Sequence, residues 1–287
     1  MPEYLTTKEL AELLRIKERK VYDLAASGEV PCSRATGKLL FAREAIEAWI
    51  AEHSSGRAAN IETRHRPNVF LGSHDPLLDW ALRQSECELA SYFDGSLDGL
   101  SRFAAGEGVS TGLHIFDEQN DAWNVSAARK MCAGQRVVLL EWAKRQRGII
   151  HSGKIGALDE LEGQNIVPRQ DGAGAQSIFQ HTLRQAGIDE SKLSYSKPAR
   201  SEQDAALAVA EGKADAAFGL ECYAAQYQLA FLPVIEERFD ILVDRKAWFE
   251  PALQKLDLFC RSKSFRDRAA ELKGYNVDGF GTVWFNA

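Results

Sequence analysis

Two long extended segments limit the folds open to the C-terminal part of this chain. They are "RVVLLEWAKRQRGIIHSG", residues 136–153, and "LAFLPVIEERFDILVD", residues 229–244. Around them, short strand patterns alternate with helical patterns of about ten to fifteen residues, which predicts a mainly parallel α/β sheet. Two strands of such length indicate two lobes joined by two crossings.

One sharp change of composition divides the chain. "AEHSSGRAANIETRHRPN", residues 51–68, is polar, rich in small residues and aperiodic, as linkers are. We therefore predict an N-terminal domain over residues 1–54, a linker over 55–67 and a large domain over 68–287. The length of 287 residues and a hydrophobic content of 45% support more than one packed core.

Composition also bounds the environment and the partners. The formal net charge of −6 argues against a protein that coats nucleic acid with its whole surface, but it allows a local DNA-reading patch. No signal peptide and no run of about 18 apolar residues is visible, so we expect a cytoplasmic protein without membrane partners. The scattered cysteines indicate neither a zinc site nor a disulfide framework; they are Cys32, Cys87, Cys132, Cys222 and Cys260.

The first fifty residues have the pattern of a small helical domain. Thr6 or Thr7 is suited to cap a helix that starts at Lys8. A second helix, from about Glu18, ends at Gly28, where a C-terminal glycine is preferred. A third helix places Ile46, Trp49 and Ile50 toward a core.

A basic hairpin lies between the second and third helices, with Thr36 and Gly37 at its tip. Two short helices followed by such a hairpin predict a winged helix-turn-helix, whose second helix fits the major groove of double-stranded DNA. A small protein-interaction module with a solvated charged face is the alternative. The predicted DNA contacts are Lys17, Arg19, Lys20, Tyr22, Arg34 and Lys38.

Residues 4–52, "LTTKELAELLRIKERKVYDLAASGEVP…GKLLFAREAIEAWI", resemble the excisionase-like branch of the MerR winged-helix group. The large domain resembles the periplasmic-binding-protein-like sensor domains found behind winged helices, which are similar to the molybdate-binding proteins of transporters. "WAKRQRGIIHSG", "NIVPRQDGAGAQ" and "VAEGKADAAFGLECYAAQYQLAFLPVIEERFDILV" carry this likeness. The resemblance implies an α/β chain: a small winged helix-turn-helix domain followed by a two-lobed type-2 periplasmic-binding-protein-like domain.

That resemblance also implies where a ligand would bind. Ser73 and Ser96 stand at the matching strand ends where molybdate-binding proteins donate hydroxyls to their oxyanion. Gly172, Gly174 and Ala175 would add backbone N–H groups from the opposite lobe, since helix N-termini favour anions. Further candidates lie near strand ends, although each considered alone also fits a structural role: His74, His114, Arg169, Glu221 and Tyr223.

The loop departs from its relatives, which often carry Arg, Ser, Thr and Arg in sequence there. Asp171, Ala173, Ala175 and Gln176 stand at those places, and Phe239 replaces a frequent tyrosine. A carboxylate within a few ångströms of an anion is unfavourable by about a kcal/mol. Molybdate or tungstate is the leading ligand class, and a small organic molecule with a carboxylate or an amine is its main competitor.

Other function classes have weaker support. Cys222 follows a strand end as a nucleophile would, but no activating partner is apparent, and the histidines lack metal-ligand spacing. We therefore expect no enzyme, no metal site and no cofactor other than a small-molecule effector. An excisionase-like architectural protein without ligand sensing remains an alternative. A homodimer or higher homo-oligomer is expected because paired half-sites supply specificity.

Overall fold

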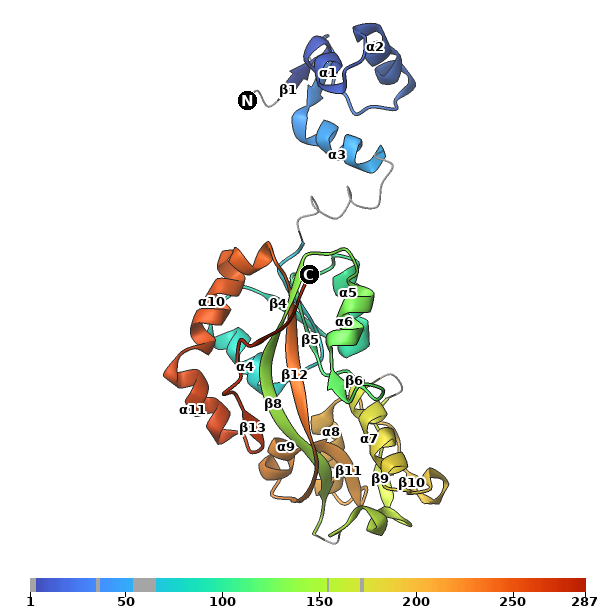
Figure 1. Ribbon diagram of the computed structural model, residues 1–287, viewed down its shortest axis with the longest axis vertical. Coiled ribbons are helices and arrows are strands. Elements are labelled where there is room, and N and C mark those ends of the chain that lie inside the picture. The colour runs from blue at the N-terminus through green and yellow to red at the C-terminus, as the bar shows by residue number, and fades with distance from the viewer. Residues whose placement is uncertain (1–3, 35–36, 54–65, 154, 171–172) are drawn as a thin grey trace. The chain divides into compact units, whose positions relative to one another are not determined.

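The computed structural model describes residues 4–34, 37–53, 66–153, 155–170 and 173–287. The chain divides into two compact units, Met1–His65 and Arg66–Ala287, whose elements are labelled in Figure 1. Of the predicted linker, residues 55–65 lie outside the described residues. Each unit has its own hydrophobic core, so each is described by itself.

The small unit combines three helices with a two-stranded antiparallel sheet. Its core contains Leu10, Val21, Phe41 and Ile46, all without significant exposed surface. Trp49 and Ile50 are half-buried and pack against this core, as the sequence predicts. The elements are β1 (Tyr4–Thr6), α1 (Thr7–Leu14), α2 (Glu18–Ser27), β2 (Leu40–Ala42) and α3 (Arg43–His53).

Helix α1 begins with a reciprocal cap. The Glu9 backbone N–H donates to the Thr6 hydroxyl at 3.3 Å, and the Thr6 N–H donates to the Glu9 carboxylate at 2.8 Å. Thr6 is therefore the N-cap, and the helix starts at Thr7, one residue before the predicted Lys8. Helix α2 starts at Glu18 as predicted, and Gly28, at a φ of 75°, terminates it.

The predicted hairpin follows α2. The backbones of Ser33 and Leu40 exchange two hydrogen bonds, at 2.7 and 3.0 Å, which close the hairpin. Gly37 lies near its tip with a φ of 74°, a conformation that glycine adopts readily. Thr36, predicted at the tip, lies outside the described residues.

A ten-stranded sheet organises the large unit, in the order β10-β9-β11-β8-β12-β5-β3-β4, with β13 and β14 paired to β8. β6 and β7 form a separate small sheet. The strands are β3 (Val69–Gly72), β4 (Ala90–Phe93), β5 (Ser110–Leu113), β6 (Phe116–Asp117), β7 (Ala122–Trp123), β8 (Val137–His151), β9 (Asn165–Val167), β10 (Ser194–Tyr195), β11 (Ala216–Leu220), β12 (Ala230–Asp244), β13 (Tyr275–Asn276) and β14 (Val283–Asn286).

The helices divide between two lobes (Figure 1). Lobe one holds β3–β5 with α4 (Pro76–Gln84), α5 (Ser96–Ala104), α6 (Val125–Met131), α10 (Pro251–Cys260) and α11 (Lys263–Glu271). Lobe two holds β9–β11 with α7 (Gly174–Gln185), α8 (Glu202–Ala210) and α9 (Glu221–Gln226). Three short 3-10 helices complete the described elements: η1 (Leu158–Leu161), η2 (Glu190–Lys192) and η3 (Ala247–Phe249).

β8 and β12 are the two predicted crossing strands, and they pair antiparallel along their whole length, from Ala230 opposite His151 to Asp244 opposite Val137. The register of β12 shifts twice, between Pro233 and Ile235 and between Phe239 and Asp240. The outer strands of each lobe are parallel, but both crossing strands run antiparallel to their neighbours. The sheet is thus mixed rather than mainly parallel, because the chain returns between the lobes along these two strands.

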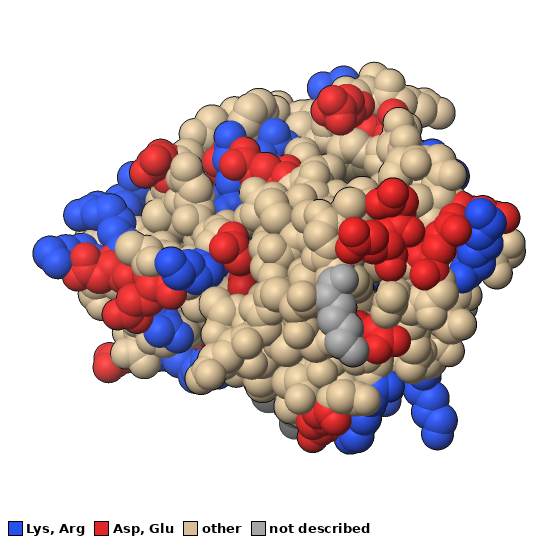
Figure 2. All heavy atoms as spheres, turned by 90° about the horizontal axis from the view of Figure 1, so that it is seen from below, with Lys and Arg blue, Asp and Glu red and all other residues tan. Residues whose placement is uncertain are grey.

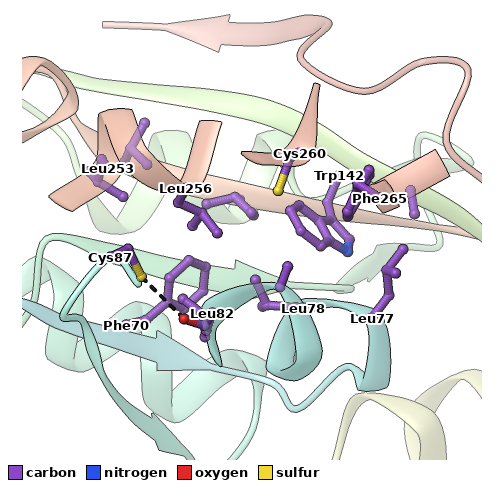
Figure 3. Close-up of a cluster of buried hydrophobic side chains, with 14 of the residues drawn as sticks. Phe70, Leu77, Leu78, Leu82, Cys87, Trp142, Leu253, Leu256, Cys260 and Phe265 are labelled. Carbon is purple, nitrogen blue, oxygen red and sulfur yellow. Dashed lines mark hydrogen bonds between the residues drawn. The ribbon is translucent and has the colours of Figure 1, made fainter. Parts of the chain in front are cut away.

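The core of lobe one lies between α4 and the two C-terminal helices (Figure 3). Leu77 and Leu78 of α4 lie on one side of this layer, and Leu256 of α10, Trp142 of β8 and Phe265 of α11 lie on the other. All are at most 5% exposed. The C-terminal strands β13 and β14, absent from the sequence prediction, pair with β8 beside this core.

Arg66, within the predicted linker, is fastened to lobe one. Its guanidinium donates to the carbonyl oxygens of Phe103 and Gly108 at 2.5 and 3.0 Å, and to the Gln135 side chain at 2.8 Å. It also pairs with Asp244, at the end of β12, at 3.2 Å. The large unit therefore includes Arg66.

Two glycines let α5 pack directly on β3. A Cβ on Gly99 would lie 2.1 Å from the Cα of Gly72, which itself has a φ of 103°. Only glycine permits this approach. It brings the start of α5 to the end of β3, where the Gly95 N–H donates to the Gly72 carbonyl at 3.1 Å.

We therefore expect Gly99→Ala to destabilise the large unit by about 1–3 kcal/mol, because the added methyl meets backbone rather than a movable side chain. Urea unfolding of the full chain measures this. Gly156→Ala is the control, since its Cβ would meet only the Glu160 carboxylate at 3.9 Å. Equal unfolding midpoints for the two variants would contradict the packing argument.

Candidate ligand-binding cleft

A cavity of about 250 Å³ lies between the lobes. It is bordered by the ends of β3, β4, β5, β9 and β11, and by the starts of the helices that follow them. In open α/β sheets such strand ends are where ligands bind. The lining residues are Ser73, His74, Phe93, Asp94, Gly95 and His114 from lobe one, and Arg169, Gln170, Ala173, Gly174, Ala175, Arg200, Ser201, Glu202, Leu220 and Tyr223 from lobe two.

On the lobe-one wall, the two predicted serines bond to each other. The Ser73 and Ser96 hydroxyls are 2.8 Å apart, and Ser96 accepts the His114 backbone N–H at 3.0 Å. Ser73 lines the cavity, whereas Ser96, 1% exposed, lies behind it. Helix α5 starts after Gly95 with no side-chain cap, so its first N–H groups are available at this wall.

The lobe-two wall supplies a half-buried cation beside a second uncapped helix start. The Arg169 guanidinium donates to the Ala199 carbonyl at 2.5 Å, and its Nε has no hydrogen-bond partner among the described residues. Burial lowers the pKa of Arg169, partly offset by the attraction of Glu202. Helix α7 starts after Ala173 without a side-chain cap. Arg169 and this helix start both favour an acidic group.

The lobes touch within the cleft. The ring of His114, from the end of β5, lies so close to Gly174 that a Cβ on the glycine would be 3.0 Å from the imidazole Cε1. Any larger residue at the start of α7 would press on this ring. Gly174 therefore permits the approach of the two walls seen here.

Behind the cavity, the crossing strands carry a buried ionic network. Arg145 pairs with Glu237 and with Asp75, the latter at 2.8 Å. Arg147 pairs with Glu237 at 2.7 Å and with Glu202 at 2.9 Å. The side chains of Arg145, Arg147, Asp75 and Glu237 are at most 1% exposed. Charges buried so close together must be paired, because burying an unpaired charge destabilises the folded state by several kcal/mol.

His114 joins this network from the cavity side. Its Nδ1 lies 3.0 Å from the Glu237 carboxylate, and its ring stacks on Phe239 at a centroid distance of 6.0 Å. The Arg145 guanidinium lies over the same phenyl ring at 4.3 Å. Phe239 thus packs against both an imidazole and a guanidinium.

Glu237 is ionised in this setting. Burial alone would raise the pKa of its carboxyl, but the charges of Arg145 and Arg147 outweigh burial and hold the pKa well below its usual range. Asp75 caps α4 by accepting the Leu78 N–H at 2.7 Å. The network therefore ties the first helix of lobe one to the crossing strands.

The cavity brings most of the predicted ligand-site residues together. Glu221 is not among its lining residues in the described part of the chain; its side chain lies against Gly274. Gly172 lies outside the described residues, as does Asp171. Those that line the cavity are Ser73, His74, His114, Arg169, Gly174, Ala175 and Tyr223.

Sequence reasoning missed the loop before α8 and the end of β4. Asp94, Arg200, Ser201 and Glu202 line the cavity. The same strand-end argument that selected Ser73 would have found them, since each lies where a strand pattern meets a helix start. Cys222, weighed as a nucleophile, is 6% exposed, and burial raises the pKa of its thiol to about 12, which favours a structural thiol.

The predicted DNA contacts are exposed on the small unit. Lys17 is the N-cap of α2, and Arg19, Lys20 and Tyr22 lie exposed on that helix, Tyr22 at 53%. On the hairpin, Lys38 and Arg34 are exposed; the Arg34 guanidinium donates to the Ala25 carbonyl at 3.2 Å. These side chains give α2 and the hairpin an accessible cationic surface.

Fold and cleft together define a two-lobed binding protein of the type-2 periplasmic class that carries a helix-turn-helix unit. Residues 79–261 match the family model described as the PBP superfamily domain, and the chain belongs to that family. Residues 4–54 match a helix-turn-helix domain, which implies DNA binding. The finer excisionase-like and MerR assignment stays a prediction.

Relatives share this organisation or part of it. The uncharacterized protein YvgK of Bacillus subtilis (strain 168) is 24% identical over 299 residues, covering 97% of this chain and 96% of its own. A putative phosphate ABC transporter substrate-binding protein from Clostridium perfringens, solved with bound phosphate, has a TM-score of 0.52 at 14% identity, over 73% of this chain and 98% of its own. A periplasmic transporter structure has a TM-score of 0.54 at 11% identity, over 74% and 88%. These likenesses show the fold.

Two kinds of feature are absent from the described residues. No helix among them is long and apolar enough to cross a membrane. Within the same ranges, no group of three or more His, Cys, Asp or Glu side chains is placed to hold a metal ion.

We expect Glu237→Gln to destabilise the large unit by about 3–5 kcal/mol, because it removes the buried carboxylate that pairs with both Arg145 and Arg147. Urea unfolding at neutral pH measures the loss. Glu236→Gln is the matched control: its neighbouring, 56% exposed side chain pairs only at the surface with Lys144, so less than about 1 kcal/mol is expected. A similar cost for both variants would show that the buried network is not the source of stability.

Proposed function

We propose that this chain is a cytoplasmic transcriptional regulator whose affinity for DNA responds to a small molecule bound between the lobes of its large unit. One observation carries the proposal: a cavity lined from both lobes belongs to the same chain as a helix-turn-helix unit whose α2 exposes Arg19 and Lys20. A binding domain joined to a DNA-reading domain is the organisation expected of a ligand-responsive regulator.

The arrangement of donors supports a ligand that carries an acidic group. The uncapped starts of α5 and α7 face the cavity from opposite lobes, and Arg169 adds a guanidinium. An acidic group held there would contact both walls at once and favour the closed arrangement in which His114 meets Gly174. Molybdate and tungstate, the leading ligand class from the sequence, are the inorganic candidates.

DNA contact is assigned to the small unit. On the face of the molecule drawn in Figure 2, acidic and basic side chains are interspersed rather than gathered by sign. A DNA-binding surface needs clustered cations, because phosphate neutralisation supplies much of the affinity. The cations of α2 and its hairpin supply such a cluster. We also propose a homodimer, since one small winged helix reads few base pairs and paired half-sites add specificity.

We expect Arg19→Ala and Lys20→Ala each to weaken DNA binding about tenfold or more, ~1.4 kcal/mol, through lost base or phosphate contacts. The probe is a duplex that the wild-type chain selects from a random pool, with affinity measured at fixed salt. Lys213→Ala, an exposed cation of the large unit, is the control and should leave affinity unchanged. Unchanged binding by both α2 variants would remove α2 as the recognition helix.

A ligand panel tests the sensing half. A compound at about 100 times its dissociation constant should stabilise the full chain by ~2.7 kcal/mol and raise its melting temperature. The panel contains molybdate, tungstate, phosphate, sulfate, small carboxylates and amino acids. We expect Arg169→Gln to lose at least most of the rise given by whichever compound acts on the wild type. The same compound should change the affinity for the selected duplex.

Two outcomes would count against sensing. If no compound in the panel raises the melting temperature or changes DNA affinity, the result favours an architectural DNA-binding protein without ligand sensing. If Arg169→Gln responds as the wild type does, the ligand binds outside this cleft.

A further inference from the structure

One cleft residue has an unused acceptor. Glu202, the first residue of α8, lines the cavity, and one of its carboxylate oxygens accepts from Arg147 at 2.9 Å. The other, Oε2, is buried and has no hydrogen-bond partner among the described residues. A buried carboxylate oxygen without a donor is costly, so native proteins seldom leave one without a purpose.

This carboxylate is charged at neutral pH. Burial raises the pKa of Glu202, but the attraction of Arg147 outweighs burial, and the pKa lies below its ordinary value. An ionised oxygen in the wall of a cavity accepts hydrogen bonds and repels anions. Glu202 therefore favours a ligand that brings a hydrogen-bond donor.

The charges of the cavity wall balance. Its carboxylates are Asp94 from lobe one and Glu202 from lobe two, and its guanidiniums are Arg169 and Arg200. A bare dianion such as molybdate offers acceptors only, and each carboxylate nearby opposes it by an amount on the order of a kcal/mol. A ligand with one positive and one negative group matches this wall.

Arg169 also has an unused group, its Nε, which is buried without a partner among the described residues. Arg169 and Glu202 line the same wall of the cavity, and the attraction of Glu202 offsets part of the burial effect on the Arg169 pKa. An unused donor and an unused acceptor thus belong to one wall. A cavity of about 250 Å³ is smaller than the sites of drug-sized ligands, which fits a small metabolite.

We propose that the cleft binds an amino-acid-like zwitterion, with its carboxylate against Arg169 and the start of α7, and its ammonium group against Oε2 of Glu202. This inference rests on the proposed function and names the ligand class of the same site. It differs from the inorganic oxyanion that the sequence favours, because an oxyanion leaves Glu202 without a donor.

The test uses the full-length chain and measures melting temperature and dissociation constant. The probes are the proteinogenic L-amino acids, the matching 2-hydroxy and deaminated acids, and phosphate, sulfate and molybdate. We expect at least one amino acid to stabilise the wild type, and its deaminated partner to bind at least about tenfold more weakly, since it lacks the group that Glu202 accepts.

Variants then locate the effect. Glu202→Gln should weaken the active amino acid about tenfold or more and tighten phosphate or molybdate, because it removes the opposing charge. Glu211→Gln, at the other end of α8, is the matched control and should change neither. Asp94→Asn, at an exposed position of the wall, provides a second test that does not disturb the buried network; a several-fold weakening is expected.

The outcomes separate this inference from the proposed function. If molybdate or another oxyanion stabilises the wild type and changes DNA affinity while no amino acid does, sensing stands and the zwitterion is wrong. If amino acids bind equally with or without their amine, or if Glu202→Gln leaves their affinity unchanged, the assignment to Glu202 is wrong. Should Glu202→Gln fail to fold, equal binding of an amino acid and of its deaminated partner by the wild type overturns the inference. If nothing binds and DNA affinity never responds, both proposals fail.

Discussion

The pairing of Arg145 and Arg147 with acids from three places is the constraint on which the large unit depends. Both guanidiniums lie on β8 without exposed surface, and each needs negative charge to remain buried. Asp75 comes from lobe one, Glu237 from β12 and Glu202 from lobe two. Neutralising two arginines of one strand therefore brings together the inner walls of both lobes. His114, bonded to Glu237 and facing the cavity, connects this network to the ligand site.

The cleft combines this fixed charge network with small residues that let backbones approach. Gly99 allows α5 to press on β3, and Gly174 allows α7 to meet His114. Both helices consequently present uncapped starts to the same cavity. The backbone N–H groups at these helix starts are thus donors that cannot rotate away. The side chains of Asp94 and Glu202 are the acceptors. A site built in this way can distinguish ligands by the placement of opposite charges as well as by size.

The sequence predicted the fold well where patterns are local. The two crossing strands, the start of α2 and its terminating Gly28, and the strand–helix alternation follow from hydropathy, length and glycine position. The prediction was incomplete where structure depends on distant partners. β13 and β14 exist because β8 offers them an edge, and the parallel sheet proved mixed because the chain crosses twice between the lobes. For the site, the positions of strand ends predicted Ser73, His114 and Arg169, but the sequence did not predict the ionic network. Its paired arginines and acids lie as much as 92 residues apart in the chain, and no local pattern records which acids neutralise which arginines.

The two register shifts of β12 lie on either side of Glu237. Bulges bend a strand and increase its local twist, whereas the ladder of β8 and β12 resists separation along its length. The link between the lobes is therefore a pair of hydrogen-bonded strands that bends at two points, with a rigid charged segment between them. Rotating one lobe against the other twists these paired strands and stores elastic energy, unlike rotation about a flexible loop. If a ligand closes the lobes as we propose, its contacts supply that energy, so small differences in charge placement within the cleft become differences in angle at the far ends of the lobes.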